Sequence, residues 1–289
     1  SEGHDRTNIT LQGQQQLLID RVLAANRRTV VILIHGGALA IDKVKATVPA
    51  VLDAHYPGQQ GGTALINVLL GAEGAAPAGR LTTTVYRADF IERNMTDMSL
   101  SNITYKHYSG DTLWDFGFGL SYSRFAVKWL DTTPTVGTAA LASAHAGYFG
   151  ARAAGQSWQS PASYSAQVIN VGNVTSDYVV LAFVSPTATR LAADPSEPKK
   201  ELFDFARVSL APKQSAAVHF SIPPAVLSHV DRFGTERLQR GEYTVTLGGE
   251  TLGGAPAIST LLTVHGTDRE LFSLAKLKQQ TTRRSNANA

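Results

Sequence analysis

The sequence contains no cysteine, which excludes disulfide bonds and thiolate metal sites. It also has no run of about 18 apolar residues, the length that a membrane-spanning helix needs, so we expect no membrane span. The formal net charge is only +3, and the dense basic stretch lies in the C-terminal tail. Nucleic-acid binding needs a clustered basic face with stacking aromatics, so we expect no nucleic-acid partner.

The start of the chain is polar and charged, so it does not read as a secretory signal. It also lacks an initiator methionine. The sequence therefore begins as a part of a longer protein would.

Apolar residues make up 43% of the sequence, which is enough to form a hydrophobic core. The length of 289 residues allows one large domain or two ordinary ones. Glycines alternate with aromatic residues in Asp115–Tyr122. This pattern favours extended backbone that runs close to another segment, because glycine has no side chain to hold a neighbour away. We interpret this stretch as the boundary between two domains of different composition.

Upstream of this boundary, helical and strand patterns alternate. The apolar, largely β-branched run at 29–34 is typical of a strand buried on both faces of a parallel sheet. The alternation predicts an α/β three-layer sandwich with a partial, mostly parallel sheet. The expected helices are 10–26, 41–48 and 63–70, and the expected strands are 29–34, 50–55 and 82–86.

Downstream, short strand patterns are separated by glycine, proline and asparagine turns, and no helix is expected between them. This spacing predicts an all-β sandwich of the immunoglobulin or fibronectin type III kind. The expected strands are 125–130, 164–171, 177–184, 205–210, 215–222, 242–247 and 259–264. Residues at about 132–161 are rich in Ala, Gly, Ser and Thr and are interpreted as an insert or linker. Residues 267–289 are interpreted as a frayed polar tail.

Several short motifs occur in order along residues 2–265, and each alone would be uninformative. They are Gly3–Leu11 with Gln14–Gln16, Val31–Ile41, Tyr56–Gly62 with Gly79–Leu81, Phe116–Phe125, Lys199–Phe203, Arg207–Val208, Leu210–Pro212 and Gly241–Tyr243. Together they resemble the C-terminal part of family 3 glycoside hydrolases, closest to the β-xylosidase branch. Ala38 and Thr82 depart from that pattern, since the family usually has proline at both positions.

This resemblance implies three segments. Residues 1–122 would be a partial family 3 C-terminal α/β sandwich domain, and 123–266 a fibronectin type III-like domain carrying the insert. Residues 267–289 would be the tail.

Family 3 enzymes are retaining glycosidases, which use one carboxylate as nucleophile and another as acid/base. The resemblance places the nucleophile in an N-terminal barrel that this sequence does not contain. It places the acid/base glutamate on a loop of the α/β domain, as the first glutamate of a Glu-x-Glu-Gly-x-Asp-Arg stretch. That glutamate would lie just upstream of Ser1, and Glu2 would be the second glutamate of the stretch. If the placement shifts by this small offset, Glu2 is the candidate acid/base. The favoured alternative is that Glu2 is a solvated carboxylate in a frayed end. Asp5 and Arg6 could pair and fix this loop, or form an exposed pair worth about 0–1 kcal/mol.

Other constellations in the sequence are not favoured as sites. His35, Ser121 and Asp115 lack the surroundings of a nucleophile elbow, and Gly36–Gly37 lacks a phosphate-loop pattern. The eight histidines show no ligand spacing, so no metal site is expected. The three tryptophans, Trp114, Trp129 and Trp158, could stack on sugars, but packing is the favoured role. No cofactor is implied.

The sequence therefore predicts the C-terminal fragment of a retaining exo-acting β-glycosidase of β-xylosidase or β-glucosidase type, inactive alone. Its partner would be an oligosaccharide, bound through the missing barrel. The alternative is a non-catalytic carbohydrate-binding or interaction module.

Four Asn-x-Thr triplets begin at Asn8, Asn94, Asn102 and Asn173 and could be glycosylated in a secreted protein. An extracellular or lysosomal/vacuolar location is expected.

Overall fold

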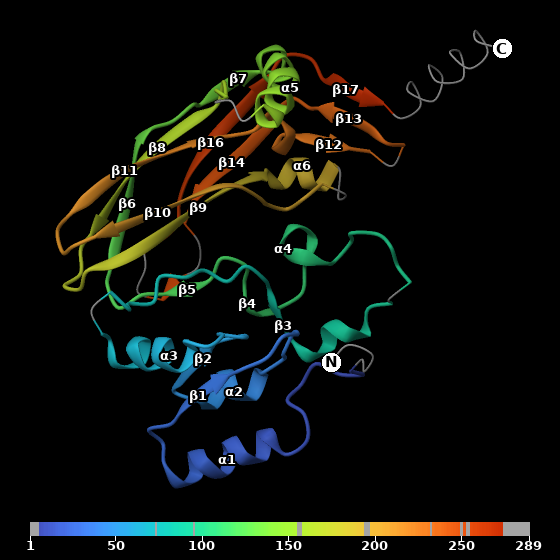
Figure 1. Cartoon of the computed structure of the whole chain (residues 1–289). Helices are drawn as coiled ribbons and strands as arrows, with labels where there is room; N and C mark the ends of the chain where they lie inside the picture. The colour runs from blue at the N-terminus through green and yellow to red at the C-terminus, as the bar shows by residue number, and fades with distance from the viewer. Residues whose placement is uncertain are drawn as a thin grey trace. The chain divides into compact units, whose positions relative to one another are not determined.

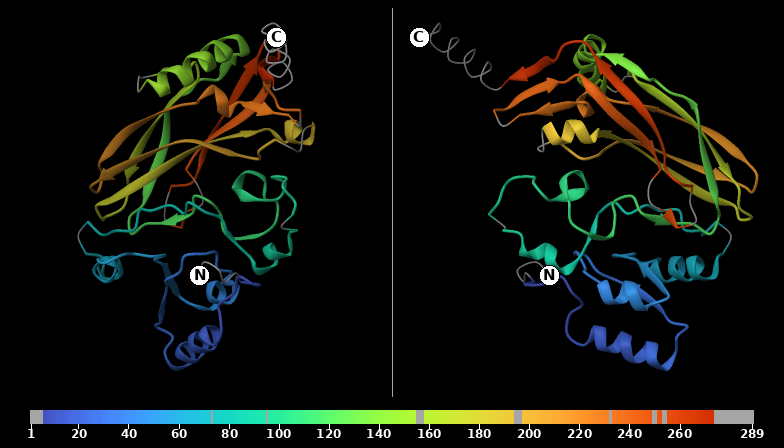
Figure 2. Two further views of the ribbon diagram at one scale, coloured as in Figure 1. Left: turned by 45° about the vertical axis from the view of Figure 1, so that its right-hand side comes forward. Right: turned by 180° about the vertical axis from the view of Figure 1, so that it is seen from behind.

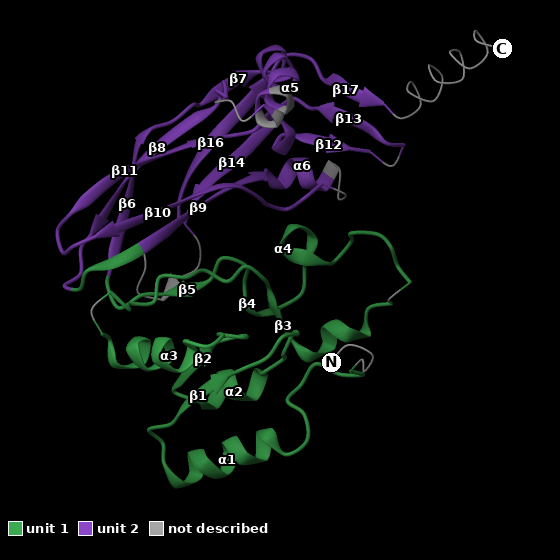
Figure 3. Cartoon of the chain, in the orientation of Figure 1, with its two compact units in different colours: residues 1–123, 174–177, 250–254 green, residues 124–173, 178–249, 255–289 purple. Residues whose placement is uncertain are grey.

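The computed structural model describes residues 6–72, 74–94, 96–154, 158–193, 197–231, 233–248, 251–252 and 255–273. The chain divides into two compact units (Figure 3). Unit 1 comprises residues 1–123, 174–177 and 250–254, and unit 2 comprises residues 124–173, 178–249 and 255–289. Within the described ranges, no helix is both long and apolar enough to cross a membrane.

Unit 1 contains the alternating helices and strands that the sequence predicts (Figure 1). Strands β1 (Val30–Leu33) and β2 (Ala50–Asp53) pair in parallel, with Leu33 opposite Asp53. Helices α1 (Gln15–Ala25), α2 (Asp42–Thr47) and α3 (Gly61–Leu70) surround them in the sequence. The later elements of unit 1 are β3 (Val85–Tyr86), η1 (Ala88–Glu92), α4 (Thr104–His107), β4 (Thr112–Trp114), β5 (Gly119–Leu120) and β15 (Thr251–Leu252).

The core of unit 1 lies on one face of β1. Leu33 and half-buried Val31 pack with Ile41, Val44 and Val48 from α2 and its flanks. The alternate side chains of this strand, Val30 and Ile32, are exposed. The expectation that this strand is buried on both faces is therefore wrong for the described part of the chain. A continuous apolar run shows that both faces suit burial but does not show which face is covered.

The glycine-aromatic segment runs close to the backbone of residues 79–81, as its alternation predicts. Gly117 has a φ of +87°, and its N–H donates to the Leu81 carbonyl oxygen at 2.8 Å. The Leu81 N–H donates to the Phe118 carbonyl oxygen, also at 2.8 Å. A Cβ atom at Gly119 would lie 2.5 Å from the Gly79 carbonyl oxygen. Only glycine fits at this crossing, because the obstructing atom belongs to the backbone.

We expect Gly119→Ala to destabilise unit 1 by about 1–3 kcal/mol, the usual cost of forcing an extra carbon into a packed contact. Gly79→Ala is the matched control, since a Cβ atom there would meet nothing within 4 Å. Urea denaturation of the full chain, followed by tryptophan fluorescence, measures both. Equal midpoints for the two variants would contradict the close approach at Gly119.

Unit 2 is built from strands in three sheets. The largest sheet has the order β10-β9-β14-β16-β7, and the others have the orders β11-β8-β6 and β12-β13-β17 (Figure 1). The strands are β6 (Phe125–Asp131), β7 (Thr135–Gly137), β8 (Ser163–Asn170), β9 (Ser176–Pro186), β10 (Glu201–Leu210), β11 (Ser215–Ser221), β12 (Ser228–Val230), β13 (Thr235–Leu238), β14 (Gly241–Leu247), β16 (Ile258–His265) and β17 (Arg269–Ser273).

Alternation along these strands produces the core of unit 2. In β8, Tyr164, Ala166 and Val168 are buried, while the residues between them are only partly covered. In β14, Tyr243 and Val245 are buried in the same way and belong to the same core cluster. Inward and outward residues alternate in this manner when two sheets pack face to face. The predicted fold class, an α/β domain followed by an all-β sandwich, is confirmed.

Several elements of unit 2 were not predicted. Helix α5 (Thr138–Ala153) occupies most of the segment interpreted as an insert, and it lies at one end of the strand layers (Figures 1 and 2). Helix α6 (Ala188–Ala193) separates β9 from β10, so the expectation that no helix intervenes is wrong. Strand β17 pairs with β13, so the expectation of a frayed tail does not hold for its residues. The domain boundaries given above stay a prediction.

Candidate functional site

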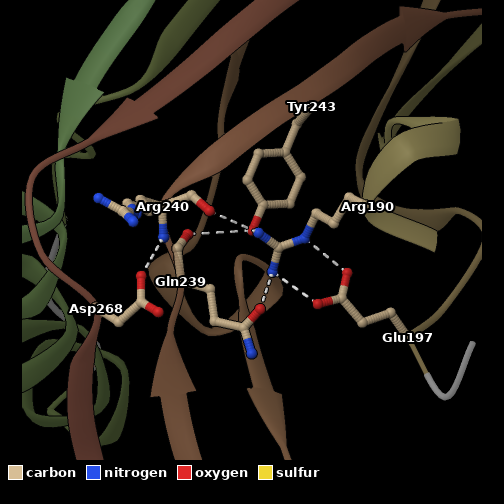
Figure 4. Close-up of polar contacts among 6 residues, drawn as sticks. All are labelled: Arg190, Glu197, Gln239, Arg240, Tyr243 and Asp268. Atoms are coloured by element: carbon tan, nitrogen blue, oxygen red, sulfur yellow. Dashed lines mark hydrogen bonds and ion pairs between the residues drawn. The ribbon is translucent and has the colours of Figure 1, made fainter. Parts of the chain in front are cut away.

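A buried arginine organises a polar cluster in unit 2 (Figure 4). The guanidinium of Arg190, on α6, donates from Nε and Nη2 to the two carboxylate oxygens of Glu197, both at 2.7 Å. Its Nη2 also donates to Gln239 Oε1 at 2.7 Å, and its Nη1 to the Arg240 carbonyl oxygen at 2.9 Å. The Arg190 and Glu197 side chains are 12% and 4% exposed.

The turn between β13 and β14 provides the rest of this Arg190 cluster. The Arg190 guanidinium carbon lies 4.7 Å from the centroid of the Tyr243 ring. Gly241 has a φ of +146°, and a Cβ atom there would lie 3.0 Å from Arg190 Nη1, so glycine suits both the backbone and the contact. The Arg240 N–H donates to Asp268 Oδ1 at 2.9 Å, which links the turn to the segment before β17.

The charges in the Arg190 cluster are fixed by these contacts. Burial disfavours the charged form of Arg190, but the hydrogen bonds and charge of Glu197 outweigh it, and the pKa of the guanidinium is raised. Burial raises the pKa of the Tyr243 phenol, so this hydroxyl stays neutral beside the ion pair. A carboxylate that accepts two guanidinium hydrogen bonds is ionised and has no proton to donate.

A small hollow beside the Arg190 cluster is lined by Glu197 and Glu201, with Val184, Pro186, Tyr243 and His229 among the other residues. Two glutamates in one hollow invite comparison with a glycosidase carboxylate pair. However, the acid partner of such a pair must hold a proton, and Glu197 is bound to Arg190 instead. The Arg190 cluster therefore acts as a structural clamp that joins α6 to the β13–β14 turn.

The N-terminal loop contains the predicted acid/base region. Glu2 and Asp5 lie outside the described residues. Arg6 Nη2 donates to the Ala38 carbonyl oxygen at 2.9 Å. The Ala40 N–H donates to the Ile9 carbonyl oxygen at 2.8 Å, and the two segments form an isolated parallel bridge. The described part of this loop is thus attached to the loop that follows β1.

Asp115, Ser121 and His35, which were not favoured as a catalytic triad, each contact different partners. Asp115 Oδ1 accepts a hydrogen bond from Thr112 Oγ1 at 2.6 Å. Ser121 Oγ lies 3.3 Å from Ser176 Oγ and accepts a hydrogen bond from the Ser123 N–H. His35 contacts Asp53 and the Gly37 carbonyl oxygen. The three therefore do not form a catalytic triad.

The three tryptophans are packed within their own units, as the favoured interpretation predicts. The amine of Lys45 lies 4.7 Å from the Trp114 ring centroid. Trp129 packs against the core of unit 2 and lies beside the Tyr164 ring. Trp158 Nε1 donates to the Ala144 carbonyl oxygen at 3.2 Å, which ties it to α5.

Two groups of interacting side chains were missed by sequence reasoning. Arg190 and Glu197 lie in a segment without a periodic pattern, between the strand expected at 177–184 and the Lys199–Phe203 motif. His35, Asp53 and His55 offer ligand atoms within 4.8 Å of one another. The spacing of the histidines along the sequence does not report this proximity of His35 and His55. The expectation of no metal site stays a prediction. The parallel register of β1 and β2, which no local motif reports, brings these residues together.

Comparison with known proteins identifies the two units' families. The model of the glycosyl hydrolase family 3 C-terminal domain matches residues 1–122, and that of the fibronectin type III-like domain matches residues 178–251.

Curated relatives match most of the chain. A probable exo-1,4-beta-xylosidase (xlnD) of Aspergillus clavatus is 31% identical over 298 aligned positions, which cover 96% of this chain and 36% of the relative. The exo-1,4-beta-xylosidase bxlB of Emericella nidulans is 35% identical, over 84% of this chain and 32% of the relative. This chain thus spans about a third of the length of the curated relatives that it matches.

A solved structure agrees with this assignment. The GH3 exo-beta-xylosidase XlnD, in complex with a xylobiose aziridine activity-based probe, superposes with a TM-score of 0.78 at 28% identity. The superposition covers 94% of this chain and 35% of that structure. The chain therefore belongs to glycoside hydrolase family 3 and corresponds to the C-terminal part of its β-xylosidase-like members, an α/β domain followed by a fibronectin type III-like domain.

Proposed function

We propose that this chain serves as the C-terminal portion of a retaining exo-acting β-glycosidase that releases terminal xylose from xylo-oligosaccharides. The observation that carries the proposal is the match of 96% of the chain to the Aspergillus clavatus relative, whose name is "probable exo-1,4-beta-xylosidase". The nucleophile comes from a preceding barrel domain, and the substrate is bound through that domain. The enzyme needs no cofactor, since double displacement uses two carboxylates and water.

The 289 residues alone are expected to be inactive, because half of the carboxylate pair is missing. The purified chain should hydrolyse nitrophenyl β-xyloside and β-glucoside no faster than buffer.

A chimera tests the proposal positively: this chain replaces the matching C-terminal third of the Aspergillus clavatus relative. We expect the chimera to hydrolyse the xyloside in preference to the glucoside. The matched control is the same upstream portion without any C-terminal third, which should be inactive.

Two outcomes would contradict these expectations. Hydrolysis by the chain alone would overturn its inactivity, and a folded but inactive chimera would overturn its role in the glycosidase.

The chimera also tests Glu2, because removing an acid/base group lowers the rate by about 10²–10⁴-fold. We expect that loss from replacing the glutamate just upstream of Ser1 by glutamine. The same loss from Glu2→Gln would instead identify Glu2 as the acid/base.

Secretion of the chimera from a yeast host tests the proposed extracellular location. Asn8, Asn94, Asn102 and Asn173 are all exposed. Glycans should therefore attach, and endoglycosidase treatment should lower the mass of the secreted protein. Retention inside the cell without glycans would contradict an extracellular location.

Calorimetric titration of the chain with xylan oligosaccharides distinguishes this proposal from the alternative of a carbohydrate-binding module. The packed tryptophans argue against a sugar platform built on them, so we expect no saturable heat from the chain with xylan oligosaccharides at about 1 mM, the upper end of ordinary KM values. Saturable binding would favour the module.

A further inference from the structure

His35, Asp53 and His55 converge at the C-terminal ends of β1 and β2. His35 follows β1, Asp53 ends β2, and His55 lies in the loop after it. His35 Nε2 lies 3.0 Å from Asp53 Oδ2, and His55 Nε2 lies 3.8 Å from Asp53 Oδ1. The side chains of His35, Asp53 and His55 are 14%, 29% and 61% exposed, so the group has one open side.

The contacts of His35 define how its ring is oriented. Its Nδ1 lies 2.6 Å from the Gly37 carbonyl oxygen, which can only accept, so Nδ1 carries a proton and donates it. In the neutral ring, Nε2 then carries a lone pair that points at the Asp53 carboxylate. Two electron-rich atoms at 3.0 Å repel each other unless a second proton or a metal cation lies with them.

The loop of His55 holds a backbone conformation that few non-glycine residues adopt. His55 has a φ of +48°. Its N–H donates to Asp53 Oδ1 at 3.2 Å, and its ring centroid lies 5.0 Å from that of His35. Strained residues of this kind cluster at ligand sites and persist because their surroundings hold them. Here the strain brings a second imidazole beside the carboxylate.

We propose that His35 Nε2, His55 Nε2 and an Asp53 carboxylate oxygen form a binding site for Zn²⁺. Histidine nitrogens and a carboxylate oxygen are Zn²⁺ ligands, and three of them leave a fourth position for water on the exposed side. The other ring nitrogen of His35 donates to a backbone carbonyl oxygen, and metal-bound histidines commonly make this contact, which fixes the orientation of the ring. Two nitrogen ligands disfavour Mg²⁺ and Ca²⁺, which prefer oxygen.

A zinc ion here would join the two loops that follow β1 and β2. The first of these loops also accepts the Arg6 hydrogen bond through Ala38. The ion would therefore stabilise the segment that holds the N-terminal loop in place. It would act structurally in unit 1, separately from the sugar chemistry proposed above.

The test uses the full chain after treatment with EDTA. Calorimetric titration with ZnCl2 should show one equivalent bound, and Co²⁺ should give the visible d–d absorption of an ion with nitrogen ligands. MgCl2 should give no binding heat. Zinc should also raise the midpoint of thermal unfolding, because a ligand that binds only the folded state stabilises it.

Three variants complete the experiment. His55→Ala and Asp53→Asn should each lower zinc affinity by at least tenfold, the lower limit of the loss seen when even supporting contacts of metal sites are removed. His219→Ala is the matched control, because His219 is an exposed histidine on β11. It should bind zinc like the original chain. Absence of zinc binding, or equal affinity in all three variants, would overturn the proposal.

Discussion

Replacing Arg190 by alanine should lower the free energy of unfolding of unit 2 by about 3–5 kcal/mol. The cost comes chiefly from Glu197, which is 4% exposed and would keep its charge in the interior without a partner. At roughly 2–4 °C per kcal/mol for a domain of this size, the unfolding midpoint should fall by roughly 6–20 °C. Scanning calorimetry of the full chain measures this shift.

A second ion pair with a similar distance but greater exposure shows whether burial causes the loss of stability. Arg87 Nη1 lies 2.8 Å from Asp42 Oδ1, nearly the same distance as in the Arg190 pair, but these side chains are 44% and 40% exposed. Arg87→Ala should therefore cost only about 0–1 kcal/mol. Equal losses for Arg87→Ala and Arg190→Ala would contradict the assignment of Arg190 as a buried clamp.

A double substitution tests the cause of the loss. Arg190→Met alone leaves the Glu197 charge buried, whereas Arg190→Met with Glu197→Leu removes both charges. Buried ion pairs can be replaced by apolar residues of similar volume with little loss of stability. We expect the double variant to be more stable than the single one. The reverse order would show that the Glu197 charge is not the source of the penalty.

Leu141→Ala should destabilise unit 2 by about 2–5 kcal/mol. Leu141 is completely buried and joins α5 to the core cluster of the sandwich. If α5 were an insert lying outside the core, truncation of this side chain would cost little. The loss includes the transfer of apolar atoms from the interior and the cavity that they leave. Urea denaturation of the full chain measures the loss.

A second substitution in α5 should have the opposite sign. Gly147 is an exposed helix residue, and a Cβ atom there would meet nothing within 4 Å. Gly147→Ala should stabilise by about 0.5–1 kcal/mol, because alanine loses less conformational freedom in a helix than glycine. If both variants leave the urea midpoint unchanged, α5 does not contribute to the folded state of unit 2.

Longer strands of the sandwich such as β8 and β14 could be predicted because buried side chains alternate with less buried ones along them. In β8, for example, every second residue from Tyr164 onward is buried. Helix α5 showed no comparable periodic pattern, because it is rich in alanine. Among its described large side chains, Leu141 is the fully buried one. Strand β13 was missed because Glu236 and Arg237 interrupt a short run of four residues.

Contacts between distant segments were not predictable from motifs. The crossing of Gly119 over Gly79 was anticipated only as a close approach to some neighbour, since glycine indicates space and does not identify the partner. The pairing of Arg190 with Glu197 depends on how α6 leads into the following loop. The grouping of His35 with Asp53 depends on the strand register, which places Leu33 opposite Asp53. Glu2 lies outside the described residues, and its role stays a prediction.

The pairing of β15 with β5 has a consequence for synthesis. Thr251 and Leu252 lie opposite Gly119 and Leu120 in a parallel pair, so unit 1 takes its last strand from far along the chain. Domains generally fold as they emerge from the ribosome, at about 5–20 residues per second. The nascent chain must therefore wait for roughly 130 further residues, about 7–26 s at that rate, before the edge of Leu120 is capped. During that interval the exposed edge is open to pairing with other chains.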